Sequence, residues 1–179
     1  EKYNEELETL RNRVLAMGGL VESQVTDAVN ALATADVRLA DQVIQNDVRV
    51  NSLEVIIDEQ CAEILARHQP AASDLRFIIS IVKTITDLER IGDQAEKVAR
   101  MAVHLAEKDR PKNQYADVQS LGDRVARLVH DALDAFARSL PRGAESLRSP
   151  LVILLAALAA LPSCAPEAVR VEAPLAVPE

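Results

Sequence analysis

The chain has 179 residues, of which 49% are hydrophobic, and this length allows one domain with a sizeable core. Only two tyrosines and two phenylalanines are aromatic, and the formal net charge is −8. Nucleic-acid binding needs clustered Lys and Arg and often aromatic platforms, so this composition argues against a nucleic-acid partner. The two cysteines are far apart and provide no disulfide framework, which suits a reducing compartment, and we expect a cytoplasmic location.

Four segments carry the apolar periodicity of long helices, at residues 4–35, 36–68, 73–107 and 116–140. Pro70 lies between the second and third segments and separates them, because proline cannot continue a helix without losing a hydrogen bond. No segment before residue 141 shows the alternation of a strand. We therefore predict an all-α fold in which residues 4–107 form an antiparallel three-helix bundle, with turns near Ala35 and Pro70.

An internal repeat links the first and fourth predicted helices. The string VTDAVNALA at residues 25–33 recurs as VHDALDAFA at residues 129–137, an offset of 104 residues. The fourth helix thus looks like the first helix of a second three-helix unit whose other helices are missing. We divide the chain into a bundle at 1–108, the first helix of a truncated repeat at 109–140, and a divergent tail rich in Pro, Ala and Leu at 141–179.

The fourth helix has an apolar stripe that needs a cover. The first bundle, the apolar tail segment at 151–161, or a second chain could provide it. Because the first bundle can satisfy its own core, we favour self-association and expect a homo-oligomer. The stripe comprises Leu121, Val125, Leu128, Ala132, Ala135 and Phe136.

Two acidic pairs stand out on the second and third predicted helices, Glu54 with Asp58 and Glu89 with Asp93. Carboxylates four residues apart share one helix face, and Asp47 extends the edge of the second helix. Oxygen ligands suit hard cations such as iron, manganese, magnesium or calcium. The two pairs are offset by about 7 Å along the bundle, which favours several ions or a shared patch over one ion. The alternative interpretation is a solvated helix edge whose acids pair with nearby arginines.

Several long strings resemble the PhoU family, accessory regulators of the bacterial high-affinity phosphate transport system. They are QPAASDLR at 69–76, KTITDLERIGD at 83–93, LAMGGLVE at 15–22 and HDALDAFAR at 130–138, so the likeness spans about residues 4–140. The resemblance implies tandem three-helix bundles and metal clusters held by Glu/Asp-x-x-x-Asp motifs. The pairs at Glu54/Asp58 and Glu89/Asp93 match that motif. The second copy of the motif found in the family has no match here, and neither has the tail.

The resemblance implies a non-enzymatic negative regulator of phosphate uptake and of the phosphate-starvation response. Its implied partners are the ATPase subunit of the phosphate transporter and a sensor histidine kinase, met at the cytoplasmic face of the inner membrane. The implied cofactor is one or more ions of iron, manganese or magnesium.

Two other functions compete with this one. A di-iron oxidase or ferroxidase would need Glu-x-x-His motifs, and none of His68, His104 and His130 has a Glu three residues earlier. A metal-free helical scaffold is the third possibility. Cys61 is predicted to be a buried structural thiol rather than a ligand, and no nucleotide-binding motif is present in the sequence.

Overall fold

The computed structural model describes residues 2–106, 108 and 115–138, and all of its regular structure is helical. The described residues contain no strand, which confirms the all-α prediction, and the observed helix ends lie within two residues of the predicted ones. All of the connection at 109–114 and all of the tail at 141–179 lie outside the described residues, as do residues 1, 107, 139 and 140. The helices are α1 (Lys2–Thr34), α2 (Val37–His68), α3 (Ala72–Ala106) and α4 (Ala116–Arg138).

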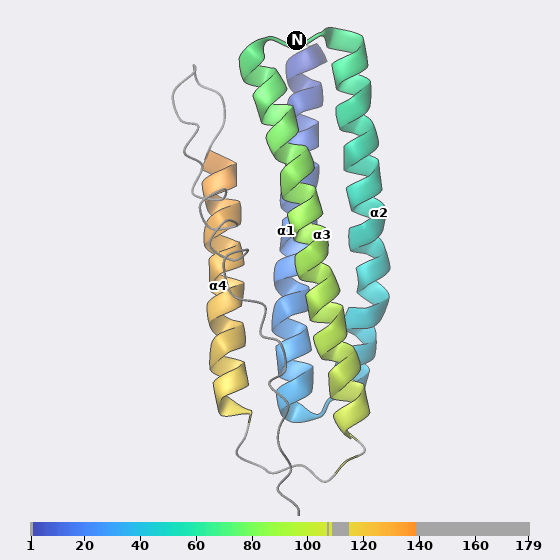
Figure 1. The fold of residues 1–179 in the computed structure, drawn as a ribbon, viewed down its shortest axis with the longest axis vertical. Helices are drawn as coiled ribbons and strands as arrows, with labels where there is room; N and C mark the ends of the chain where they lie inside the picture. The colour runs from blue at the N-terminus through green and yellow to red at the C-terminus, as the bar shows by residue number, and fades with distance from the viewer. Residues whose placement is uncertain (1, 107, 109–114, 139–179) are drawn as a thin grey trace, which may run out of the picture.

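Both predicted turns are present, and each has an identifiable local cause. Ala35 adopts a φ of 59° after α1, and the side chain of Asp36 then caps α2 by accepting a hydrogen bond of 3.0 Å from the amide of Leu39. Gln69 ends α2 in the left-handed conformation, with a φ of 44°, and Pro70 follows it. These short turns bring α1, α2 and α3 together as an antiparallel bundle (Figure 1).

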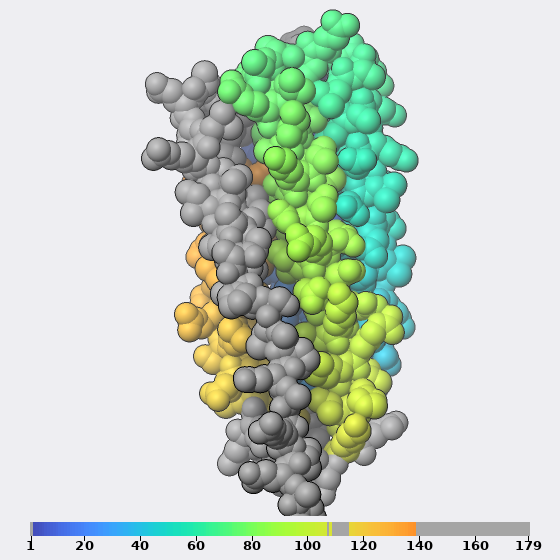
Figure 2. All heavy atoms as spheres, viewed as in Figure 1, coloured from blue at the N-terminus to red at the C-terminus, as the bar shows by residue number. Residues whose placement is uncertain are grey.

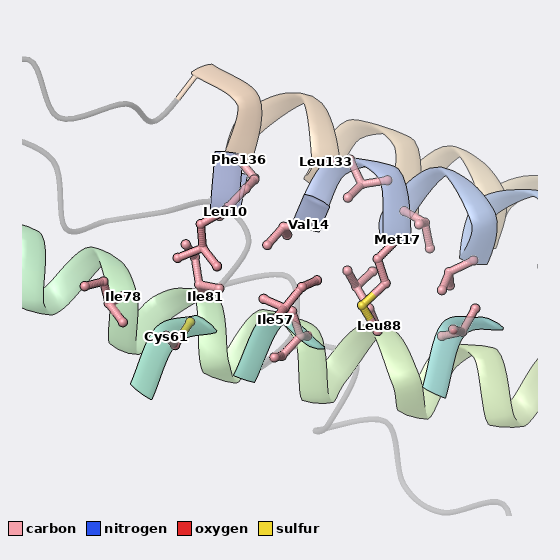
Figure 3. Close-up of a cluster of buried hydrophobic side chains, with 14 of the residues drawn as sticks. Leu10, Val14, Met17, Ile57, Cys61, Ile78, Ile81, Leu88, Leu133 and Phe136 are labelled. Atoms are coloured by element: carbon pink, nitrogen blue, oxygen red, sulfur yellow. The ribbon is translucent and has the colours of Figure 1, made fainter. Parts of the chain in front are cut away.

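The core of the bundle changes character along its length. At one end large side chains from three helices interlock, among them Met17, Ile57 and Leu88 (Figure 3). At the other end the buried side chains are mostly alanines. Along α3 the buried side chains accordingly become smaller, from Ile81 to Ala102. Small side chains let helices approach closely, and Figure 2 shows the side chains of α2 and α3 in contact along both helices.

α4 lies against α1 and runs antiparallel to it (Figure 1). Its buried residues are Gly122, Val129, Ala132, Leu133 and Phe136. The Phe136 ring also stacks on Phe77 of α3, with 6.2 Å between the ring centroids. α4 thus packs on the first bundle, which was one of the three predicted covers for its apolar residues. Self-association, the cover we favoured, is not tested by a single chain.

The bundle covers only part of the predicted stripe of α4. Ala132 and Phe136 are buried against the bundle, whereas Leu121 is 62% exposed and Leu128 is 39% exposed. The packing on α1 selects the face that contains Leu133, which the predicted stripe omitted. Among the described helices, none combines the length and the apolar character that a membrane span requires.

Candidate functional site

Four of the five predicted carboxylates, on α2 and α3, interact through their charges. Partial burial raises the pKa of Glu89, and the charges of Asp93, Glu54 and Asp47 raise it further, while Arg90 lowers it. Carboxylates whose charges act on one another in this way repel when they are all ionised. The charges of residues from both acidic motifs therefore act on one carboxylate of α3.

Asp58 differs from the other predicted site residues in its surroundings. It is exposed, and the group it acts on is Cys61 rather than Glu89 or Asp47. Burial raises the pKa of the Cys61 thiol to about 12, and the Asp58 charge contributes to this rise. Cys61 is only 1% exposed and belongs to the hydrophobic core, in agreement with the predicted structural role.

Asp47 is the buried member of the cluster, with 6% of its surface exposed. The Asn51 side chain donates a hydrogen bond of 3.0 Å to its Oδ2 atom, but its Oδ1 atom has no partner. Burial raises the pKa of Asp47, and so do the charges of Glu96 and then Asp93, whereas Asn51 and Gln24 lower it. A carboxylate buried with an unpartnered oxygen is costly, because its lost hydration is not replaced.

Gln24 of α1 completes this polar centre, and the sequence interpretation missed it. Its side chain is 3% exposed, and its amide lies close enough to the Asp47 carboxylate to lower the pKa of Asp47, although neither amide atom makes a hydrogen bond of good geometry. A Cβ atom on Gly92 of α3 would lie 3.1 Å from the Gln24 Oε1 atom and 3.4 Å from the Asp47 Oδ1 atom. The missing side chain at Gly92 thus lets polar groups of α1 and α2 approach α3.

Two sequence signals could have pointed to the missed residues. Gln24 is polar and stands among buried apolar residues of α1, beside Val25 and one turn from Val21 and Ala28. Glu96 lies three residues after Asp93, which places it on the same side of α3. Neither belongs to a Glu/Asp-x-x-x-Asp string, and for this reason the motif alone does not include them.

The carboxylate oxygens of Asp47, Glu54, Glu89 and Asp93 are chemically suited to bind a hard cation. All of these ligating atoms are oxygens, the carboxylates repel one another, and Asp47 Oδ1 lacks a partner that a cation would provide. Within residues 2–106, 108 and 115–138, however, no three His, Cys, Asp or Glu side chains form a group that could hold a metal ion. The chemistry of the cluster therefore supports metal binding more strongly than its side-chain geometry does.

The three histidines all have partners away from this cluster. The imidazole of His68 lies 2.8 Å from a Glu6 oxygen, and that of His130 lies 3.2 Å from a Glu22 oxygen. His104 lies 3.1 Å from the ammonium nitrogen of Lys108. No histidine is thus placed to join the carboxylates as a di-iron centre of the Glu-x-x-His type would require.

Comparison with protein families and curated proteins gives one consistent result. Residues 14–102 match the family model described as the PhoU domain. The phosphate-specific transport system accessory protein PhoU homolog of Pseudomonas aeruginosa is 56% identical over 138 residues, covering 77% of this chain and 57% of that protein. The accessory protein PhoU of Escherichia coli K12 is 48% identical over 138 residues, covering 76% and 56%. The chain thus spans little more than half the length of these relatives.

Solved structures agree with the sequence matches. The crystal structure of PhoU from Pseudomonas aeruginosa is similar with a TM-score of 0.74 and 57% identity, covering 76% of this chain and 65% of that chain. The phosphate transport system regulatory protein PhoU from Streptococcus pneumoniae has a TM-score of 0.68 and 33% identity, covering 75% and 63%. The shared fold includes the helices that carry the acidic cluster.

Proposed function

Since the described helices of this chain belong to the PhoU family, we propose that it acts as a non-enzymatic accessory regulator of a phosphate-specific transport system. Its output would be repression of phosphate uptake and of the phosphate-starvation response. The observation that carries this proposal is the match to the Pseudomonas aeruginosa structure, in both sequence and fold. The proposal concerns a chain that spans only 57% of the curated Pseudomonas aeruginosa relative.

The proposed partners are the ATPase subunit of the phosphate transporter and a sensor histidine kinase. The names of the relatives support an association with the transport system, because each is described as an accessory protein of that system. The proposed site of action is the cytoplasmic face of the inner membrane, where such a transporter exposes its ATPase subunit.

Metal binding at the acidic cluster is a further part of the proposal. Asp47, Glu54, Glu89 and Asp93 would hold one or more ions of iron, manganese or magnesium. A bound cation would neutralise their mutual repulsion and would tie α2 to α3, so metal would stabilise the folded bundle. Asp58 completes the motif in the sequence but lies outside the group of carboxylates that act on Glu89.

The regulatory function can be tested in a bacterium whose own PhoU gene is deleted and whose phosphate-starvation promoter drives a reporter. Expression of the full 179-residue chain at high phosphate should lower the reporter signal. A variant with Glu89→Gln and Asp93→Asn, checked for normal helix content, tests whether the cluster is needed. A reporter signal that the intact chain leaves unchanged would contradict the proposed function.

Metal binding can be tested separately by thermal unfolding of the purified chain. Iron(III), manganese(II) or magnesium(II) at saturation should raise the melting temperature, and Glu89→Gln with Asp93→Asn should remove the rise. Asp58→Asn is the matched control, because it removes one motif carboxylate that lies apart from Glu89. A melting temperature that none of these metals changes would identify the cluster as a solvated edge.

A further inference from the structure

Basic side chains form a straight row on the outer surface of α3. Residues seven positions apart return to nearly the same side of a helix, so the row turns by only about 20° at each step. At a rise of about 1.5 Å per residue, it extends for about 32 Å. All of its members are exposed, and α3 can be followed from end to end in Figure 2. We call this set the basic row, and it comprises Arg76, Lys83, Arg90 and Lys97.

The acidic residues of α3 are set back from the basic row. Each of them is half-buried, whereas every Lys and Arg of the helix is exposed. These half-buried acids are Asp74, Asp87, Glu89, Asp93 and Glu96. On the exposed surface of α2, by contrast, both signs of charge occur, as at Arg49 and Glu59. The outermost charge of α3 is therefore positive, although the chain as a whole carries a net charge of −8.

Most of the charge in the basic row is not neutralised by ion pairs within the chain. Arg90 pairs with Asp87 at 3.5 Å, and its side chain is still 70% exposed. The Arg76 side chain donates a hydrogen bond of 3.2 Å to a backbone oxygen, that of Ala72. Among residues 2–106, 108 and 115–138, no carboxylate forms an ion pair with the lysines of the row. Their charges remain available to a ligand.

Exposed apolar side chains lie beside the basic row near both of its ends. Ile79 is 44% exposed and follows Arg76 by three residues, and Met101 is 54% exposed and follows Lys97 by four residues. Residues three or four apart are neighbours on the surface of a helix. The same strip of α3 thus offers both positive charges and apolar contacts, a combination typical of protein-binding surfaces.

We propose that the basic row of α3 docks an acidic amphipathic α-helix of a partner protein. This helix would carry Asp or Glu at seven-residue intervals, with apolar residues placed to contact Ile79 and Met101. A row with a strict seven-residue spacing follows the path that a second helix takes when it packs alongside the first. Opposite charges along that path would select the partner and its register. The proposal rests on the surface of α3 and does not depend on the proposed regulatory function.

An anionic membrane surface fits this strip less well than a helix does. A flat surface wide enough to meet the basic row would also approach the flanking carboxylates of Glu89, Asp93 and Glu96, which would repel anionic lipids. A helix is only about 10 Å wide and can lie along the row itself. The position of the acidic residues therefore favours a narrow partner.

The test uses the full chain and two synthetic helical peptides of about five heptads, built from Ala, Leu and Gln. The first peptide has Glu at every seventh position, and the second has Gln in place of each Glu. Fluorescence anisotropy in the presence of a chelator measures the affinity of the chain for each peptide. The Glu peptide should bind at least about tenfold more tightly than the Gln peptide. Raising the salt concentration from about 50 mM to about 500 mM should weaken its binding.

Substitutions in the chain locate the binding surface. Lys83→Gln together with Lys97→Gln should weaken binding of the Glu peptide by roughly tenfold, because two charge pairs are lost. The matched control is Arg38→Gln with Arg49→Gln, at exposed positions of α2, and it should change the affinity by less than about twofold. Both variants lose two positive charges, so a difference between them cannot come from net charge.

Four results would overturn the proposal. The first is no binding of the Glu peptide, and the second is equal affinity for the two peptides. The third is equal weakening by the α3 and α2 substitutions, which would show general attraction rather than docking. The fourth is a different occupant that the α3 substitutions displace. Tighter binding to vesicles of phosphatidylglycerol and phosphatidylcholine would identify a membrane surface, and a dimer seen by light scattering would identify a second copy.

Discussion

Leu133 of α4 occupies the space in which a side chain at Gly18 of α1 would have to lie. The next residue, Gly19, has no neighbouring atom within 4 Å of the position of a Cβ atom. Only Gly18 of this glycine pair is therefore at a close contact between helices. The two adjacent glycines thus form an internal comparison for the contact between α1 and α4.

Gly18→Ala should lower the free energy of unfolding, and Gly19→Ala should raise it. At Gly19 alanine has open space and gains up to about 1 kcal/mol in helix propensity. At Gly18 the same gain is outweighed by overpacking against Leu133, which typically costs about 1–3 kcal/mol. Urea unfolding of both variants measures the difference. Equal stabilisation by the two substitutions would show that Leu133 does not pack on Gly18 in solution.

Asp47→Asn should raise the free energy of unfolding at pH 7 in the presence of a chelator. The pKa of Asp47 is raised in the folded state, chiefly by burial. Ionisation of Asp47 therefore lowers the free energy of unfolding once the pH exceeds the pKa of this group in the unfolded chain, near 3.8. The benefit of the substitution should therefore vanish at pH 3, where the acid is protonated in both states. The substituted amide would keep an oxygen that accepts the hydrogen bond from Asn51. Asp41→Asn, at an exposed position on α2, controls for the loss of one negative charge.

The contact of His130 with Glu22 should make the docking of α4 on α1 depend on pH. The hydrogen bond to Glu22 raises the pKa of His130, and the charges of Glu22, Asp134 and Asp131 add to the rise. Because the pKa is raised in the folded state, protonated His130 stabilises the fold fully below its unfolded-state pKa of about 6.5. This contribution is lost as the pH rises through the pKa of His130 in the folded state. Its magnitude should be small because His130 is exposed.

NMR titration of the histidine ring protons measures this effect directly. The His130 signal should titrate above the usual range, and Glu22→Gln should return it towards that range. Between pH 6 and pH 8, the free energy of unfolding should change less for His130→Gln than for the unaltered chain. The change should be reduced rather than abolished, because His68 and His104 remain. An unshifted His130 titration would place Glu22 out of contact in solution.

Cys61 should resist alkylation in the folded protein. Its thiol is 1% exposed, and burial raises its pKa to about 12, so very little reactive thiolate exists at pH 8. Mass spectrometry after iodoacetamide treatment of a Cys164→Ser variant should show no labelling of the native chain and full labelling in denaturant. Labelling at the rate of a free thiol would show that the core around Cys61 opens readily.

The sequence by itself determined the helices and their turns. These features depend on short-range chemistry, namely the 3.6-residue period, the break at Pro70 and the cap at Asp36. The two acidic motifs could be found for the same reason, because carboxylates four residues apart share a face of any helix. The repeat that relates residues 25–33 to residues 129–137 was also a property of the sequence alone.

Only the tertiary structure decided which of these residues meet. The charges of Asp47, Glu54 and Asp93 act on Glu89 because packing along α2 and α3 sets how these two helices face each other. The same long-range packing placed Gln24 beside Asp47, and it buried Leu133 and Phe136 of α4 while Leu121 stayed exposed. A helical period specifies faces within one helix, but the partner of each face is determined by contacts between residues far apart in the chain.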